Sequence, residues 1–175
     1  MKKLLTTVAL LALFVAPSFA QSLGGSYVNL VSPTTVDPGD TGVVFQFYVW
    51  NASTDAEWVT DVVFTFPSCF TVTAGSYTYT GSNPAWTFTF TPSGYIANFN
   101  DGDAGYGEIY GGDGGTFFVT VNVGVGCPPG PATVHWSLTG DDWGSPPHFV
   151  EGDVEFTIGG TATEVSTWSS VKALY

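Results

Sequence analysis

The sequence predicts an all-β protein, an antiparallel two-sheet β-sandwich. From Tyr27 onward, apolar residues recur at every second position, the period of a strand with one buried face. The intervals between these runs are rich in glycine, proline, asparagine, aspartate and serine, which form turns. About eight or nine strands at this spacing, with no convincing long helix, favour two packed sheets with crossed connections. A closed barrel is the alternative topology, because alternation alone does not distinguish the two.

The first clear strand covers residues 43–50, where Phe45 and Phe47 share one face and Gln46 and Tyr48 the other. The later runs cover residues 62–66, 70–72, 86–91, 117–125, 132–139 and 154–158. Many outward positions hold threonine, which favours strands and stays hydrated without charge. Threonine therefore explains how the chain manages with only 10% charged residues.

The two ends of the chain depart from this strand pattern. Residues 1–20 have the features of a bacterial-type secretory signal peptide: two lysines, an apolar run too short to span a bilayer, and a small-residue pattern ending at Ala20. We expect cleavage there, a β-sandwich domain over residues 21–160, and a product that is secreted or held in the cell envelope without a membrane span. Residues 161–175 carry apolar side chains at steps of three and could form a short helix, a sorting segment or a frayed end.

The chain contains two cysteines, Cys69 and Cys127, and both follow the predicted signal peptide. Export to an oxidising compartment favours a disulfide between them, with two free thiols as the alternative. Each cysteine lies beside turn residues, so we expect the bond to join the ends of two strands. Closing this 58-residue separation restricts the unfolded chain by about 4 kcal/mol in the loop-entropy account.

The charge balance excludes some classes of function. The sequence has 15 acidic and 3 basic residues, and Lys2 and Lys3 lie in the predicted signal peptide. Nucleic-acid binding depends on Lys and Arg, so we expect no nucleic-acid partner. A content of 44% hydrophobic residues is too high for a disordered acidic tail.

Catalytic motifs are sparse. There is no Gly-x-Ser-x-Gly sequence, and the histidines are His135, on an outward strand position, and His148, shortly before Glu151 and Asp153. A blue-copper site is excluded because no histidine precedes Cys127 and the predicted mature chain has no methionine. We therefore expect a protein that is not an enzyme.

The loop over residues 100–108 is the most suggestive local feature. Asp101 and Asp103 repeat at a two-residue step that lets alternate oxygens reach one hard cation, and Glu108 could complete the set. The spacing is not that of an EF-hand. A calcium site is one interpretation, and a solvated acidic turn is the other. We expect no other cofactor.

Aromatic residues outside the core pattern are the second group of candidate binding residues. Trp58, Tyr106 and Trp143 fall on outward or loop positions, where rings can stack on sugars or anchor a protein partner. Trp50, Tyr77, Tyr79 and Tyr110 fall on outward or loop positions by the same pattern. The alternative is that these rings pack under loops or across the sheet.

Residues 36–41 (Val-Asp-Pro-Gly-Asp-Thr), followed by a strand ending at Trp50-Asn51, resemble the opening of the immunoglobulin-like conserved-repeat and cell-adhesion-related (CARDB-type) domains of bacterial surface proteins. Residues 62–67, a strand that ends in proline, and residues 117–125 before Pro129-Gly130 fit the same pattern. The cysteine pair and residues 132–138 depart from it. The resemblance implies a non-catalytic structural or adhesion module with a protein or glycan partner at the cell surface. A carbohydrate-binding domain that uses the exposed aromatics, with or without calcium, is the alternative.

Overall fold

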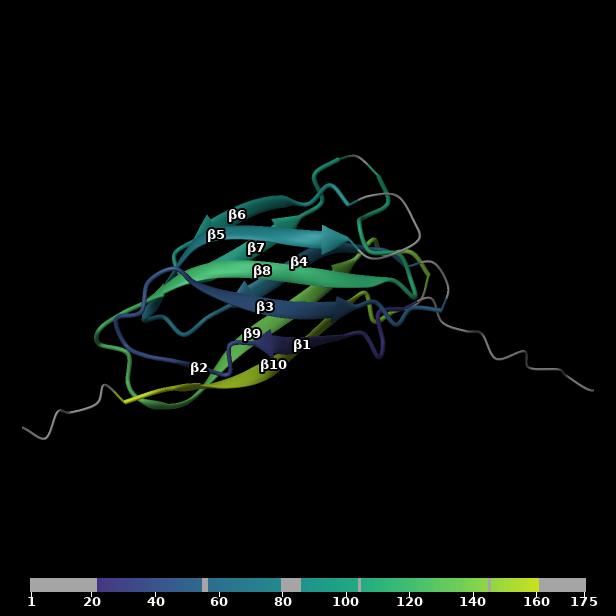
Figure 1. Ribbon diagram of the computed structural model, residues 1–175. Helices are drawn as coiled ribbons and strands as arrows, with labels where there is room; N and C mark the ends of the chain where they lie inside the picture. The colour runs from purple at the N-terminus through teal and green to yellow at the C-terminus, as the bar shows by residue number, and fades with distance from the viewer. Residues whose placement is uncertain (1–21, 55–56, 80–85, 104, 145, 161–175) are drawn as a thin grey trace, which may run out of the picture.

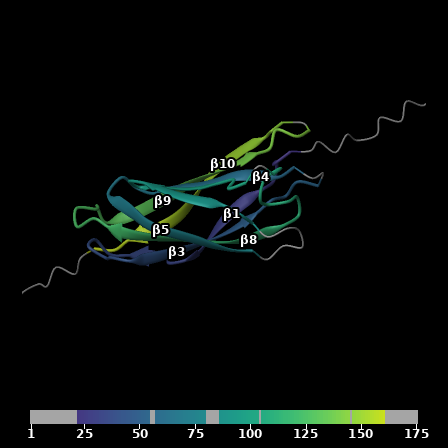
Figure 2. The ribbon, with the colours of Figure 1, turned by 90° about the horizontal axis from the view of Figure 1, so that it is seen from above.

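The computed structural model describes residues 22–54, 57–79, 86–103, 105–144 and 146–160. Within these ranges the chain forms ten strands and no helix, and the strands make two sheets that face each other (Figures 1 and 2). The predicted all-β two-sheet sandwich is confirmed. No helix in these ranges is long and apolar enough to cross a membrane. The predicted signal peptide (1–20) and tail (161–175) lie outside the described residues and stay predictions.

The two sheets have different sizes. The smaller sheet has the order β1 (Tyr27–Ser32), β3 (Val43–Trp50), β8 (Gly114–Val123) and β5 (Phe70–Tyr79). The larger has the order β2 (Thr35–Val36), β10 (Phe149–Ile158), β9 (Gly130–Gly140), β4 (Val59–Thr65), β7 (Ile96–Asn100) and β6 (Thr89–Ser93). Neighbouring strands run antiparallel, except that β2 pairs in parallel with β10. Successive strands such as β3, β4 and β5 alternate between the sheets, so the connections cross from one layer to the other.

The core between the sheets is aromatic. Phe45, Phe47 and Phe117 enter it from the smaller sheet, Phe64 and Phe99 enter it from the larger one, and all five are fully buried. The rings of Phe47 and Phe64 stack with centroids 4.2 Å apart, and those of Phe99 and Phe117 meet edge to face at 4.9 Å. Aromatic pairs of this kind stabilise a core beyond the area that they bury.

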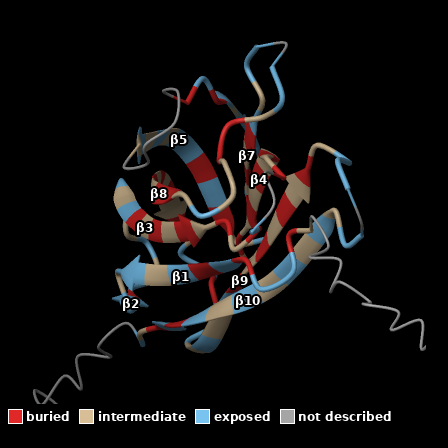
Figure 3. Cartoon of the chain, turned by 90° about the vertical axis from the view of Figure 1, so that its right-hand side faces the viewer, coloured by how far each residue is buried: buried red, intermediate tan, exposed pale blue. Residues whose placement is uncertain are grey.

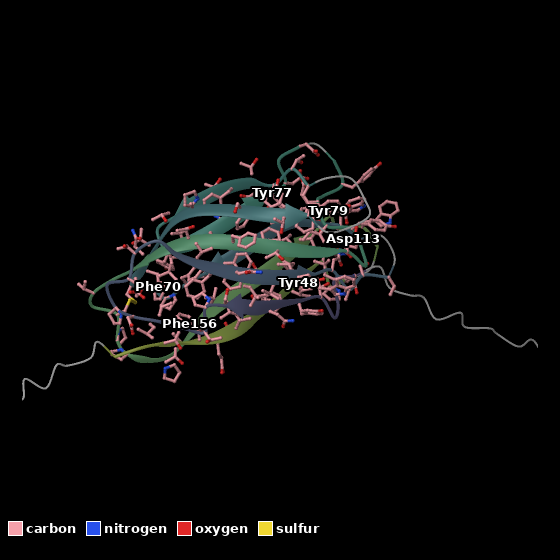
Figure 4. The ribbon with its side chains drawn as sticks, viewed as in Figure 1. Tyr48, Phe70, Tyr77, Tyr79, Asp113 and Phe156 are labelled. Carbon is pink, nitrogen blue, oxygen red and sulfur yellow. A yellow bond between two sulfur atoms is a disulfide. The ribbon has the colours of Figure 1, made fainter. Side chains whose placement is uncertain are left out.

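The disulfide lies at one end of the sandwich. Cys69 and Cys127 are bonded, with their Cα atoms 5.5 Å apart, and the bond joins the start of β5 to the β8–β9 connection. Figure 4 shows the sulfur atoms near Phe70, at the end opposite Asp113. The predicted disulfide between strand ends is thus present.

β5 and β6 differ from the strands predicted for these parts of the sequence. β6 begins only at Thr89, because Trp86 and Phe88 are buried against the core ahead of the strand instead of pairing in the sheet. β5 continues past the predicted 70–72, and a bulge between Val72 and Ala74 shifts its register. After the bulge, Tyr77 and Tyr79 pack against the core, so the prediction that they take outward or loop positions is wrong.

Candidate functional site

Three connections meet at the end of the sandwich opposite the disulfide, which Figure 3 views face on. They are the β3–β4 connection (51–58), the β7–β8 connection (101–113) and the β9–β10 connection (141–148). The predicted aromatic residues Trp58, Tyr106 and Trp143 and the predicted acidic residues Asp101, Asp103 and Glu108 lie on these connections. The fold therefore gathers at one end residues that are far apart in the sequence.

Trp58, Tyr106 and Trp143, together with Asp141, line a hollow of about 290 Å³, the aromatic pocket. Tyr106 is 77% exposed and Trp143 61% exposed, so both rings project into solvent. Trp58 is half-buried and packs edge-on against Tyr110, with ring centroids 4.8 Å apart. The structure thus brings together the three aromatic residues predicted from the sequence, one from each connection.

The β7–β8 connection is joined to the first residue of β4 by backbone hydrogen bonds, and to the β3–β4 connection by Asn51. The backbone N–H of Val59 donates to Ile109 O at 2.9 Å, and that of Glu108 donates to Val59 O at 2.8 Å. Asn51 is fully buried, and its Nδ2 donates to Glu57 O and to Ile109 O, both at 2.8 Å. Trp58 is held between these bonds, so its position is set by the fold.

Gly107 lets the β7–β8 connection approach Trp58 closely. Its φ is +124°, a conformation that residues with side chains rarely adopt. A Cβ atom there would lie 2.8 Å from the Cβ of Trp58. Glycine is therefore required beside Tyr106 for both conformational and steric reasons.

Asp141 fixes the third wall of the aromatic pocket. Its backbone N–H donates to Trp58 O at 3.1 Å, and its Oδ1 accepts the backbone N–H of Trp143 at 3.2 Å. Asp142, between them, has a φ of 60°. This left-handed residue turns the chain and places Trp143 next to Asp141.

Asp101, Asp103 and Glu108 also come together, as the acidic triad, with one oxygen of each within 4.8 Å of the others. Thr87 contacts two of them: its Oγ1 lies 2.9 Å from Asp103 Oδ2 and 2.6 Å from Glu108 Oε1. Its backbone N–H donates to Glu108 Oε2, and Glu108 is buried. A set of carboxylate and hydroxyl oxygens is the donor set that suits a hard cation such as calcium.

A buried Glu57–His148 pair links the β3–β4 and β9–β10 connections. Glu57 is fully buried, its Oε1 lies 2.8 Å from His148 Nδ1, and its Oε2 has no hydrogen-bond partner. Burial raises the pKa of Glu57 above its ordinary value, and His148 opposes this shift. Asp141 and Asp142 add a smaller increase to that pKa.

Sequence reasoning missed Asn51, Glu57 and Thr87 as residues that build this end of the molecule. Asn51 follows directly after a strand, which was the only available signal. His135, predicted to face outward, does so: its side chain is 45% exposed and lies 3.5 Å from Glu151 and 3.1 Å from Asp153. The carboxylates near His148 in sequence thus lie beside His135.

Comparison with solved structures agrees with this geometry at the level of the fold. A chain from a type I cohesin–dockerin complex of Clostridium thermocellum superimposes with a TM-score of 0.50 and 21% identity, over 75% of this chain and 98% of that one. The protein has an immunoglobulin-like β-sandwich fold. The N-terminal domain of a Streptococcus gordonii adhesin matches with a TM-score of 0.51 and 9% identity, over 76% of this chain and 32% of that one.

AvmM, which catalyses macrocyclization in alchivemycin A biosynthesis, also shares the fold, with a TM-score of 0.51 and 15% identity over 82% of this chain and 94% of that one. No protein-family model and no curated protein matches the sequence. At such identities the likeness concerns the fold alone, and the side chains must indicate the function.

Proposed function

We propose that this protein is a non-catalytic secreted or cell-surface module, related in architecture to the conserved-repeat and cell-adhesion-related domains, that binds a protein partner. The observation that carries the proposal is that Trp58, Tyr106 and Trp143 line one pocket, at the end of the sandwich opposite the disulfide. Exposed aromatic side chains on such loops commonly anchor partners. The disulfide supports an oxidising compartment outside the cytoplasm.

The proposed absence of catalysis rests on the side chains, because AvmM has the same fold. Among the described residues, neither histidine lines the aromatic pocket. His135 contacts Glu151 and Asp153 on the outer face of the larger sheet, and His148 contacts buried Glu57. These contacts favour a structural role for both imidazoles.

The test is binding of the labelled mature chain to cell envelopes of the organism that makes it. We expect saturable binding that weakens at least about tenfold in Trp143→Ala, since an anchoring aromatic contributes more than about 1.4 kcal/mol. Tyr95→Ala is the matched control, because Tyr95 is a 38% exposed aromatic in the β6–β7 turn, at the disulfide end. Equal loss in both variants, or no binding by the wild type, would contradict the proposal.

Carbohydrate binding is a second candidate function, favoured by the exposed rings around the aromatic pocket. Flat tryptophan and tyrosine faces can stack on sugars. A glycan array separates the two candidates. Reproducible sugar binding that is lost in Trp58→Ala and Trp143→Ala would favour the carbohydrate-binding module. An array without any signal would contradict it.

We also propose calcium as a ligand of the acidic triad, which the all-oxygen surroundings of Asp101, Asp103 and Glu108 support. Millimolar calcium should then raise the melting temperature of the wild type. Asp103→Asn should abolish the rise, whereas Asp153→Asn, at an exposed position of β10, should keep it. An unchanged wild-type melting temperature would leave the solvated acidic turn as the better interpretation.

A further inference from the structure

The charged side chains described around the aromatic pocket are acidic. Asp141 lines it, Asp142 follows, and the acidic triad lies in the same connection as Tyr106. The described residues contain no lysine or arginine, because Lys2, Lys3 and Lys172 all lie outside them. The field at this end of the molecule is therefore negative, and it attracts cations and repels anions before any contact forms.

The carboxylate of Asp141 is oriented by the backbone rather than neutralised. Its Oδ1 accepts the N–H of Trp143, and the bond from its own N–H to Trp58 O fixes the residue between the two tryptophans. Among the described residues, no side-chain cation contacts it. A negative charge is thus held in the wall of a pocket whose other walls are aromatic.

Aromatic faces and a carboxylate attract the same kind of ligand. The π faces of tryptophan and tyrosine carry negative partial charge, and a cation over them gains about 0.5–2 kcal/mol, depending on desolvation. A neutral sugar would stack on the rings and could donate hydroxyl hydrogen bonds to a carboxylate, but it would gain no charge–charge attraction from the negative field. An anionic group would be repelled by them.

We propose that the aromatic pocket receives a cationic side chain, lysine or arginine, from a basic segment of the partner protein. This inference rests on the proposed function and specifies the chemistry of the partner. The alkyl stem would lie against Trp58, the charged head would meet the exposed faces of Tyr106 and Trp143, and Asp141 would supply the counter-charge. The negative field would also accelerate the encounter, at a rate that falls with salt.

The test uses the full mature chain and an unstructured glycine–lysine peptide as the probe, with the Nε-acetylated form of the same peptide as the uncharged control. Titration followed by calorimetry should show binding of the lysine form that weakens with added salt, and no binding of the acetylated form. Trp143→Leu keeps every charge of the protein and removes only the exposed ring. We expect it to weaken binding about 3- to 20-fold, as a lost cation–π contact would.

Two matched charge variants separate the pocket from the general negative field. Asp141→Asn keeps an oxygen that can accept the Trp143 N–H and should weaken binding about as much as Trp143→Leu. Glu155→Gln removes the same charge from an exposed position of β10 and should change the affinity less than about twofold. Equal effects of Asp141→Asn and Glu155→Gln would overturn the inference, and so would full affinity in Trp143→Leu.

Failure of this inference can be distinguished from failure of the proposed function. If envelope or glycan binding depends on Trp143 but the lysine peptide does not bind, the pocket recognises a neutral ligand and the cationic assignment is wrong. If neither the envelopes nor the peptide depend on Trp143, the proposed function fails as well.

Discussion

Asn51 and Glu57 are fully buried polar residues in the connection that carries Trp58, and each closes a contact between loops. Asn51 donates to Glu57 O and to Ile109 O, and Ile109 O also accepts the backbone N–H of Val59. Glu57 places a carboxylate against His148 from the β9–β10 connection. Single buried polar groups therefore hold the aromatic pocket in shape, although neither lines it.

Replacing Asn51 should destabilise the protein. Asn51→Ala leaves Glu57 O without the amide donor and removes one of the two donors to Ile109 O, and we expect the free energy of unfolding to fall by about 1–3 kcal/mol. Urea unfolding measures the change. Asn122→Ala is the control, because the hydrogen bond that Asn122 accepts from the backbone N–H of Gly42 is exposed, and its loss should cost less than about 1 kcal/mol. Similar losses in both variants would contradict the structural role of Asn51.

The raised pKa of Glu57 predicts a pH dependence of stability. The folded state holds the Glu57 proton more tightly than the unfolded chain does, where the ordinary value is 4.5. The contribution of Glu57 to the unfolding free energy is therefore fully present below that value and is lost as the pH rises through the raised pKa. Relative to Glu57→Gln, the wild type should lose at most about 1.4 kcal/mol per pH unit across this window.

Urea unfolding of both proteins at a series of pH values checks this sign. Glu155→Gln, at an exposed strand position, is the control for the loss of one carboxylate. A wild type that gains stability relative to Glu57→Gln as the pH rises would contradict the prediction.

At the scale of the element, the bulge in β5 decides which tyrosines enter the core. Alternation places Val72 inward, and a regular strand would then turn Tyr77 and Tyr79 outward. The extra residue at the bulge reverses this parity, so Tyr77 packs against Phe117, and Tyr77 Oη donates to Trp86 O at 3.0 Å. The error in the sequence prediction came from assuming an uninterrupted period of two.

Gly75, just after the bulge, should not tolerate a side chain. A Cβ atom there would lie 2.8 Å from Phe99 Cζ and closer still to the ring of Phe90. Gly75→Ala should therefore overpack the junction of β5 with β6 and β7 and lower the unfolding free energy by about 1–3 kcal/mol. In Gly126→Ala the new methyl group meets nothing within 4 Å, so the thermal stability of this control should change much less.

At the scale of the whole molecule, the disulfide and the aromatic pocket lie at opposite ends of the sandwich. The double variant Cys69→Ala, Cys127→Ala should lose about 4 kcal/mol of unfolding free energy, because the unfolded chain regains the entropy of a 58-residue loop. Chemical unfolding measures this loss, and reduction of the wild type should give a similar value. A stability equal to that of the oxidised wild type would show that the unfolded chain gains little from losing the bond.

The sequence by itself determined the fold class, the faces of most strands and the disulfide partners. Strand faces are a local property, since side chains alternate along any extended backbone, and two cysteines permit only one intramolecular pair. It also indicated that Trp58, Tyr106, Trp143 and the acidic triad lie outside the core pattern, but it misplaced Tyr77 and Tyr79. It missed β7, whose short run offers only Ala97 and Phe99 as buried positions.

Only the tertiary structure decided which connections meet. Trp58, Tyr106 and Trp143 are brought together because β4, β8 and β10 begin at the same end of two stacked sheets. The partners of Asn51, Glu57 and Thr87 likewise come from distant or separate segments. No local pattern contains these pairings, since strand order and loop contacts are fixed by packing between residues remote in the sequence.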